Sequence, residues 1–391
     1  EKEYWKLEEG KSYFVTRNGS SIIAFHLPKK DFQGFHIVAS HSDSPTYRIK
    51  EQPEMSVEKH YTKLNIERYG GMIPETWFDR PLSVAGRIII EENGQIKDQL
   101  VNIDRDLMII PNLAIHMSRS SNESKQLNPQ KDLLPLCGGN LTKDGFEEMI
   151  AKESGVEKED ILSYDLFLYN RMRGTTLGIN EEFVAAPKLD DLECAYSSIE
   201  GMLNAKLSKD YVTVCAVFDN EEVGSGTKQG AGSTFFPEVL KRISYLCGKN
   251  EEEYYMAVAD SFMLSADNAH AVHPNYQDKT DPTNRPYINE GIVLKYNASQ
   301  KYTTDANSAA LVKYLCKKEK IKCQVFFNRS DMLGGSTLGN ILTGQVSIKA
   351  ADIGLPQLSM HSTYETAGCK DLDDMITLMG SFYELGKEVQ I

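Results

Sequence analysis

The sequence feature that most constrains the fold is an apolar run that ends abruptly in acidic residues. Residues 211–218 read YVTVCAVF and are followed directly by DNEE at 219–222. A continuous run of β-branched and apolar residues is typical of a strand buried on both faces of a sheet. In open α/β sheets, ligands and reacting groups gather beyond the carboxyl ends of such strands. The run therefore predicts an α/β sheet that carries carboxylates at one edge.

The adjacent residues Glu221 and Glu222 have two interpretations. An isolated Glu-Glu pair is usually a solvated acidic turn after a strand. In an extended segment, however, successive side chains point to opposite sides, so Glu222 could bind a metal ion while Glu221 reaches a water molecule beside it. The choice between the two depends on which residues end the other strands.

Length and charge limit the classes of protein that this chain can form. At 391 residues the chain is too long for one compact core, so one large domain and a smaller one are expected. Hydrophobic residues make up 41% and charged residues 25%, as in ordinary globular proteins. The net charge of −13 argues against nucleic acid or an anionic membrane as a partner, because either calls for a basic surface.

The seven cysteines indicate a reducing compartment. Their number is odd, they are widely spaced and no two form a Cys-x-x-Cys motif, so they are predicted to be free thiols. No apolar run has the length of a transmembrane helix, and Glu1 opens into charged residues without a signal-peptide pattern. These features predict a cytoplasmic protein.

The hydrophobic pattern divides the chain into an outer and an inner part. Residues 47–175 contain short β-like pieces, among them 83–90 and 95–101 around an Asn-Gly turn, which predicts a β-hairpin. Residues 1–46 and 176–391 instead alternate between strand and helix patterns, as in an α/β sheet covered by helices on both faces. We predict a discontinuous α/β domain and a smaller, inserted β-rich domain that serves in assembly or covers the site.

Several elements follow from hydrophobic periodicity. Helical spacing of apolar residues predicts helices over 192–203, 236–246, 305–318 and 372–383, and short apolar runs predict strands over 256–259 and 323–327. Within the inner part, one helix is expected near 145–153.

Two histidines stand at the ends of apolar runs. His41 ends the run 34–40 and is followed by Asp43, and His361 ends a short run near the C-terminus. A neutral imidazole is a good zinc ligand, and a carboxylate two residues on can fix its tautomer. His41 is therefore a candidate ligand with Asp43 as its orienting partner. The alternative is that the Asp-Ser-Pro sequence after His41 only closes the strand with a turn.

Two aspartates stand in similar positions. Asp190 precedes a predicted helix, which a helix N-cap would explain equally well, and Asp267 follows an apolar run. The strand ends together offer two imidazoles and three carboxylates, from His41, Asp190, Glu222, Asp267 and His361. This set suffices for two zinc ions if one carboxylate bridges them and a water molecule fills the remaining position. Glu221 would then be the general base that passes a proton of that water to the leaving amine.

Six stretches of the sequence carry a family resemblance. They are ASHSDSP at 39–45, WFDR at 77–80, PKLD at 187–190, DNEEVGS at 219–225, SADNAHAVHPNY at 265–276 and SMHS at 359–362. In this order they resemble the M18 metallopeptidases, the aspartyl aminopeptidase family. The resemblance covers nearly the whole chain and implies a mixed-sheet zinc-peptidase domain with helices on both faces and an inserted dimerisation domain. Members usually carry a helical segment ahead of the position of Glu1, so further residues are expected there.

The resemblance also implies which residues bind two Zn²⁺ ions in each subunit. The first ion is expected on His41, Asp190 and Asp267. The second is expected on Asp190, Glu222 and His361. Co²⁺ or Mn²⁺ could replace zinc in such a mixed nitrogen and oxygen site.

Two further assignments follow from the resemblance. Glu221 is expected to be the catalytic base, and Asp43 is expected to lie behind His41, in agreement with the chemical argument above. Where the family has Asn after the bridging aspartate, this chain has Asp191, which adds a carboxylate at that position.

The resemblance further implies contacts with peptide substrates. His270 and Lys295 are expected to bind substrate, and the ammonium group of Lys295 would suit a first residue that is Asp or Glu. The alternative is that Lys295 is an ordinary surface lysine. His116, which could otherwise be a core or surface histidine, matches a residue that the inserted domain presents to a neighbouring subunit. The expected assembly is a tetrahedral homo-oligomer, usually a dodecamer built from dimers.

The sequence thus predicts a dinuclear zinc aminopeptidase that prefers an acidic first residue. Two other classes stay open. One is a metallohydrolase with the same ligands, such as an aminopeptidase that prefers neutral residues, a carboxypeptidase or an N-deacylase. The other is a catalytically silent oligomeric binding protein, against which the retention of all five ligands and Glu221 argues.

Overall fold

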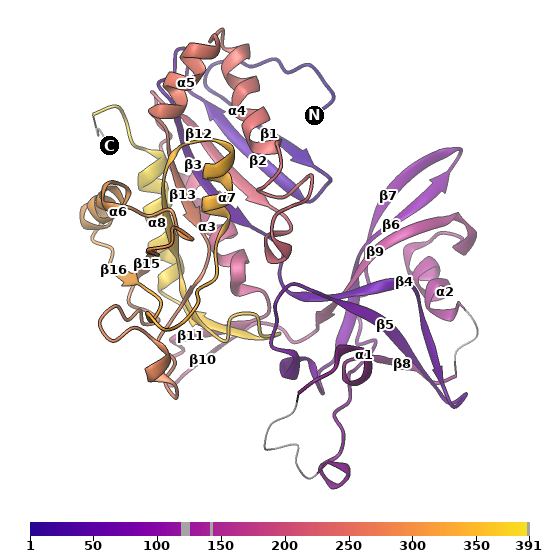
Figure 1. Ribbon diagram of the computed structural model, residues 1–391. Coiled ribbons are helices and arrows are strands. Elements are labelled where there is room, and N and C mark those ends of the chain that lie inside the picture. Colours follow the sequence, from indigo (N-terminus) through magenta and orange to yellow (C-terminus); the bar gives the residue numbers. More distant parts are fainter. Residues whose placement is uncertain (119–125, 141–143, 389–391) are drawn as a thin grey trace. The chain divides into compact units, whose positions relative to one another are not determined.

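The chain forms two compact units. The computed structural model describes residues 1–118, 126–140 and 144–388 (Figure 1). The larger unit comprises residues 1–44, 175–360 and 365–391, and the smaller unit comprises residues 45–174 and 361–364.

An eight-stranded mixed sheet forms the centre of the larger unit. Its strands, in spatial order, are β1 (Lys11–Arg17), β2 (Ser21–Leu27), β12 (Val212–Phe218), β3 (Phe35–His41), β13 (Phe262–Ala266), β17 (Lys349–Gly354), β15 (Ile292–Lys295) and β16 (Cys323–Phe326). Strands β12, β3, β13 and β17 run parallel to one another. Their carboxyl ends therefore meet at one edge of the sheet, where ligands bind in α/β proteins.

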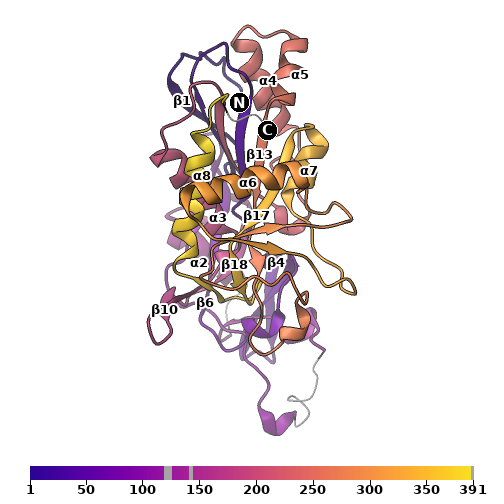
Figure 2. The same cartoon turned by 90° about the vertical axis from the view of Figure 1, so that its left-hand side faces the viewer.

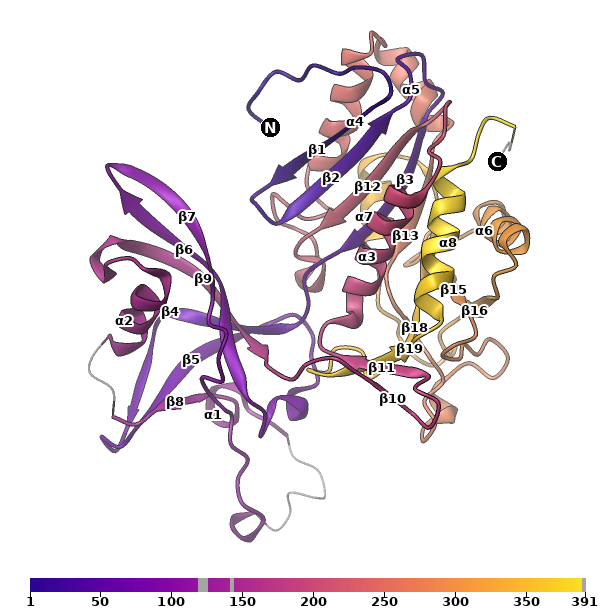
Figure 3. The same cartoon turned by 180° about the vertical axis from the view of Figure 1, so that it is seen from behind.

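Helices cover both faces of this sheet. Those on one face are α3 (Leu189–Asn204), α6 (Ala306–Glu319) and α8 (Asp371–Tyr383), and those on the other are α4 (Phe235–Leu246), α5 (Glu251–Ala259) and α7 (Leu338–Gln345). Figure 3 shows α3 and α8 side by side, and Figure 2 shows α6 on the same face. In β12, Val214 and Ala216 pack into one hydrophobic core while Cys215 and Val217 pack into the other. The continuous apolar run is buried on both sides, as predicted.

A second sheet of five short strands completes the larger unit. Its strands, in spatial order, are β10 (Thr175–Leu177), β11 (Phe183–Ala186), β19 (Glu365–Gly368), β18 (Pro356–Leu358) and β14 (Ala269–His270). Within the described part of the chain, none of the helices combines the length and apolarity that crossing a bilayer needs.

The smaller unit is built on a six-stranded antiparallel sheet. Its strands, in spatial order, are β7 (Gln95–Asn102), β6 (Leu82–Glu92), β9 (Ile161–Asn170), β4 (Thr46–Val57), β5 (Tyr61–Tyr69) and β8 (Leu136–Gly138). Its helices are α1 (Pro129–Asp132) and α2 (Gly145–Ser154), with 3₁₀ turns at η1 (Pro74–Trp77), η2 (Ile115–Met117) and η4 (Lys158–Asp160). The predicted hairpin is confirmed, because β6 pairs antiparallel with β7 across the Asn-Gly turn.

One predicted strand is wrong. Residues 256–259 end helix α5, and the strand β13 begins only at Phe262. Asn250 caps this helix through a capping box with Glu253, and three glutamates fill its first turn. These signals start a helix that runs into the apolar residues, so a short apolar run alone was misleading.

Candidate metal centre

His41 ends strand β3, beside the end of the central strand. The parallel register places His41 opposite Phe218, the last residue of β12. Its imidazole is 1% exposed, and Nδ1 lies 3.2 Å from the carbonyl oxygen and 3.3 Å from the carboxylate of Asp43. Because these oxygens act as acceptors, Nδ1 carries a proton, and Nε2 is the nitrogen that would face a metal ion. Nε2 lies 3.6 Å from Asp190 Oδ1.

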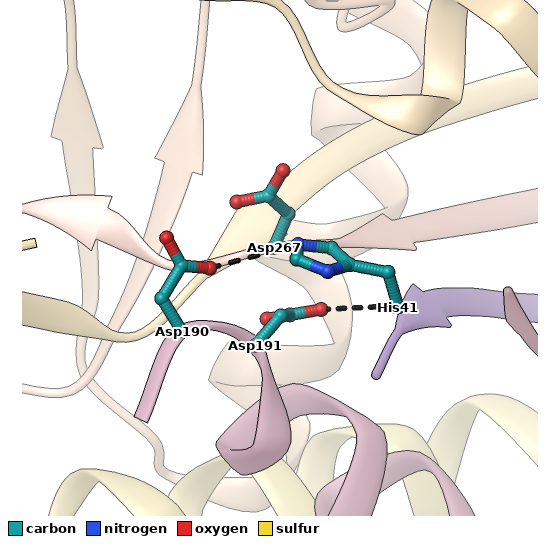
Figure 4. A group of neighbouring side chains, drawn as sticks. All are labelled: His41, Asp190, Asp191 and Asp267. Atoms are coloured by element: carbon teal, nitrogen blue, oxygen red, sulfur yellow. Dashed lines mark hydrogen bonds and ion pairs between the residues drawn. The ribbon is translucent and has the colours of Figure 1, made fainter. Parts of the chain in front are cut away.

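Four buried side chains converge at this point. His41, Asp190, Asp191 and Asp267 each offer one ligand atom, and these atoms all lie within 4.8 Å of one another (Figure 4). One imidazole nitrogen with carboxylate oxygens is a donor set that suits zinc and similar divalent ions. The residues therefore fit a metal ion, and they come from the ends of strands β3 and β13 and from the start of helix α3.

The carboxylates around this point carry strongly perturbed pKa values. Burial raises the pKa of Asp191 well above its usual range, and the charges of Asp267 and Asp190 raise it further. Burial likewise raises the pKa of Glu221 to about 7 and that of Glu222 to about 10. Such a concentration of buried negative charge is stabilised by a divalent cation, which favours the ionised form of each carboxylate.

Glu221 and Glu222 follow β12 in a 3₁₀ turn, η5 (Glu221–Val223). Their backbone N–H groups donate to the two carboxylate oxygens of Asp43, at 3.0 and 3.1 Å. Asp43 therefore holds the Glu-Glu pair as well as His41. The prediction that the pair is extended is wrong, because Glu221 and Glu222 lie in a 3₁₀ helix. The alternation of side chains along a strand therefore does not set their directions.

Asp190 lies at the start of α3. Its backbone is non-helical, with φ −80° and ψ 111°. Because an N-cap residue also has a non-helical backbone, these angles do not test the N-cap alternative. Its N–H donates to Glu365 Oε2 at 3.0 Å, and its carbonyl oxygen accepts from Ser44 Oγ at 3.0 Å. These two contacts hold the backbone at Asp190 from both sides.

Asp191 joins the group although the sequence did not assign it a role. Its Oδ2 accepts the backbone N–H of His41 at 3.2 Å. Two consecutive aspartates were a visible signal, but sequence alone does not show that both are buried in one place. The backbone angles of Asp191, φ −117° and ψ 26°, are also non-helical.

Asp267 follows β13, and Lys295 approaches it from β15. The ammonium group of Lys295 donates to the carbonyl oxygens of Asp267 at 2.6 Å and Asn268 at 3.2 Å. Burial alone would lower the pKa of Lys295, but Asp267, Tyr302 and Asp352 together outweigh it and raise the pKa. The alternative that Lys295 is a surface lysine is wrong, because its side chain is only 2% exposed.

Comparison with known proteins identifies the family. A family model described as "Aminopeptidase I zinc metalloprotease (M18)" matches residues 1–383. The chain belongs to the M18 family. It is 46% identical over 394 residues to the "Probable M18 family aminopeptidase 2" of Clostridium novyi (strain NT), which covers 98% of this chain and 90% of that protein. The family predicted from the six stretches is thereby confirmed.

Solved structures of M18 enzymes share the fold. The cryo-EM structure of the Ape4 and Nbr1 complex matches with a TM-score of 0.94 and 38% identity, over 98% of this chain and 78% of that chain. The structure of an S. cerevisiae mApe1 dodecamer matches with a TM-score of 0.83 and 28% identity, over 96% of this chain and 85% of that chain. The predicted α/β fold class is confirmed, and this M18 enzyme is an aminopeptidase of the metallopeptidase type.

His270 of this M18 enzyme lines a cavity in the larger unit. The exposed side chain follows Asp267 by three residues, in β14. The cavity has a volume of about 280 Å³, and His273, Lys279 and Arg329 also line it. No aspartate or glutamate is among its lining residues in the described part of the chain. The cavity is therefore suited to a negatively charged or polar group.

Two predicted site residues of the M18 enzyme belong to the smaller unit. His116 is exposed in η2. His361 begins the segment 361–364, and its carbonyl oxygen accepts the N–H of Ile73 at 3.1 Å. The roles of both residues stay predictions.

Proposed function

We propose that this M18 enzyme is a dinuclear zinc aminopeptidase that removes the first residue of peptides, preferably Asp or Glu. The observation that carries the proposal is the buried group around His41, Asp190 and Asp267, whose ligand atoms lie within 4.8 Å of one another. The carboxylate of Asp43 lies beside His41 and also accepts the backbone N–H groups of Glu221 and Glu222. These three acidic residues supply the remaining parts of a hydrolytic site.

The ligands divide between two ions in this proposal. His41, Asp190 and Asp267 would hold the first ion. Asp190, as the bridging carboxylate, would hold the second together with Glu222 and His361. Zinc suits these nitrogen and oxygen donors, and Co²⁺ or Mn²⁺ could take its place. Paired ions in such a site lower the pKa of a bound water and polarise the peptide carbonyl group.

Glu221 is the general base in this proposal. Its carboxylate takes a proton from the attacking water, whose oxygen forms a bond to the carbonyl carbon of the first residue. The same carboxylate then gives the proton to the leaving nitrogen as the C–N bond breaks. Asp43 keeps this base and His41 in fixed relative positions, because it bonds to both segments.

The cavity beside His270 is the proposed site for an acidic first side chain. Positively charged or imidazole side chains from His273, Lys279 and Arg329 line it together with His270. Arg329 also forms a two-pronged ion pair with Asp331, at 2.8 and 2.7 Å, which uses part of its hydrogen-bonding capacity. Lys295 was predicted to contact substrate, but its ammonium group faces Asp267 and Asn268.

Assembly is the proposed task of the smaller unit. The similarity to the yeast mApe1 dodecamer supports a homo-oligomer, and we extend it to a tetrahedral dodecamer built from dimers. His116, exposed in η2, would then reach the active site of a neighbouring subunit. Small peptides would enter such an assembly and folded proteins would not.

A reducing, cytoplasmic location is also part of the proposal. The seven cysteines are free thiols, as their spacing predicted. Free thiols persist in a compartment that keeps them reduced.

The specificity can be tested with five matched peptides that begin with Asp, Glu, Leu, Ala or acetylated Asp. We expect metal-dependent release of Asp and Glu at higher kcat/KM than Leu or Ala, because the cavity is cationic, and no release from the acetylated peptide. Release of the first residue is measured on protein supplied with Zn²⁺, Co²⁺ or Mn²⁺. Faster release of Leu than of Asp or Glu would contradict the proposed acidic preference. Cleavage of the acetylated peptide would indicate an N-deacylase or another hydrolase with the same metal ligands.

A further inference from the structure

Asn268 is a buried polar residue next to one of the candidate metal ligands. It directly follows Asp267, just beyond the end of strand β13, and it is 3% exposed. A buried side-chain amide is unfavourable unless its N–H groups and its oxygen find hydrogen-bond partners. The partners of Asn268 therefore show which segments it holds together.

The side-chain amide of Asn268 is bonded to the start of helix α3. Its Nδ2 donates to the carbonyl oxygen of Leu189 at 3.1 Å, and Leu189 directly precedes Asp190. Because a backbone carbonyl oxygen can only accept, this bond fixes which end of the amide is the nitrogen. At the other end, Oδ1 accepts the thiol proton of Cys194 at 3.2 Å, further along the same helix.

The same nitrogen has two more acceptors. Nδ2 lies 3.1 Å from Glu193 Oε2 and 3.1 Å from Gln357 Oε1. An amide nitrogen carries two protons, so the three acceptors share them. Gln357 belongs to β18, which runs parallel to the short strand β14 that begins directly after Asn268. Asn268 thereby joins the end of β13, the start of α3 and strand β18.

The partners of Asn268 are themselves buried. Leu189 and Glu193 are each 8% exposed, Gln357 is 1% exposed and Cys194 is 0% exposed. Bulk water cannot readily replace a hydrogen bond among such groups, so leaving them unpaired is unfavourable. The amide of Asn268 is therefore held in one orientation from several sides.

The place of these bonds in the chain connects them to the metal site. Asp267 lies one residue before Asn268, and Asp190 lies one residue after Leu189, the acceptor of its amide. The two aspartates come from different elements, yet their ligand atoms lie within 4.8 Å of each other. A metal ion binds tightly only when its ligands are held at the distances it requires. A bond that joins the two main-chain segments at this point controls that spacing.

We propose that Asn268 is a positioning residue that fixes the distance between the carboxylates of Asp190 and Asp267 by joining the end of β13 to the start of α3. This inference rests on the proposed function, since it takes both aspartates as metal ligands. The side chain of Asn268 bonds to protein groups, so it acts on the metal ion through the two aspartates.

A positioning role and a merely structural role predict different results for Asn268→Leu, which replaces the amide by an apolar group of similar size. Positioning predicts that zinc binds about 10- to 100-fold more weakly, as when other residues that orient metal ligands are removed. A merely structural role predicts a lower Tm of the metal-free protein but an unchanged zinc affinity of the folded protein.

The experiment is a titration of metal-stripped, full-length protein with Zn²⁺ in competition with a chromophoric chelator, at a temperature at which circular dichroism shows each variant to be folded. Asn340→Leu makes the same change at a half-buried asparagine on α7 and should bind zinc like the unchanged protein. Asn268→Ala removes the same hydrogen bonds, and it replaces Asn268→Leu if that variant does not fold. Positioning predicts weaker zinc binding for Asn268→Ala as well.

Two outcomes of this titration decide the proposal. Weaker zinc binding in the Asn268 variants, with Asn340→Leu unchanged, supports it. Unchanged zinc affinity in the Asn268 variants overturns it, even if their Tm falls. If the unchanged protein binds zinc but cleaves no peptide, the proposed function fails while the affinity difference still decides the role of Asn268.

Discussion

Replacing Glu221 by Gln is expected to lower kcat by about 10²- to 10⁴-fold, the usual contribution of a general base, while both metal ions stay bound. The amide has the shape of the carboxylate but cannot accept the proton of the attacking water. The contacts of Asp43 to this turn involve the backbone N–H groups, so the substitution leaves them in place. Steady-state kinetics on an Asp-initiated peptide and metal analysis of the same sample measure both quantities.

Glu252→Gln is the matched control for this experiment. Glu252 is exposed on helix α5, so the substitution makes the same chemical change away from the site and should leave kcat unchanged. Loss of metal from Glu221→Gln would mean that Glu221 is a ligand. Nearly full activity would mean that another group removes the proton.

Asp190→Ala is expected to weaken the binding of both metal ions by more than about 100-fold. In the proposed arrangement this carboxylate is shared, and losing a direct ligand costs more than the 10- to 100-fold effect of losing a group that only orients one. The backbone bonds of Asp190 to Glu365 and Ser44 do not involve the deleted carboxylate. Zinc titration of the metal-stripped variant measures its affinity for zinc, and the rate of peptide cleavage should fall as that affinity falls.

Asp191→Asn tests which of the two neighbouring aspartates binds the metal ions. The amide oxygen can still accept the His41 N–H that Asp191 binds at 3.2 Å, so this variant should keep both ions. If Asp191→Asn lost its metal while Asp190→Ala kept it, Asp191 and not Asp190 would be the bridging ligand. Both are in the buried group, so this comparison is needed to assign the bridging ligand.

Strand ends could be predicted from the sequence because burial on two faces leaves a strong pattern. The run that forms β12 is continuously apolar and ends in acids, and the run that forms β3 ends in His41. Parallel neighbours then bring such ends together, as the register of His41 with Phe218 shows. Helix α6 was predicted to within one residue at each end, because Asp305 caps it and its apolar face has helical spacing.

Local geometry inside the site could not be predicted in the same way. The 3₁₀ turn at Glu221 and the non-helical start of α3 at Asp190 depend on bonds to Asp43 and Glu365, which are far away in the sequence. The burial of Lys295 depends on an intervening strand that the sequence places more than fifty residues later. Long-range contacts of this kind override local propensity.

The most direct test of a dinuclear metallopeptidase is to titrate the metal-stripped protein with Zn²⁺ while following both bound metal and release of Asp from a peptide. The account predicts that binding saturates at two ions per subunit and that full activity requires the second ion, because in the proposed arrangement both ions would share Asp190 and activate one water. The same peptide with an acetylated amine should stay intact throughout. Saturation at one ion with full activity, or turnover that does not depend on zinc, cobalt or manganese, would contradict it.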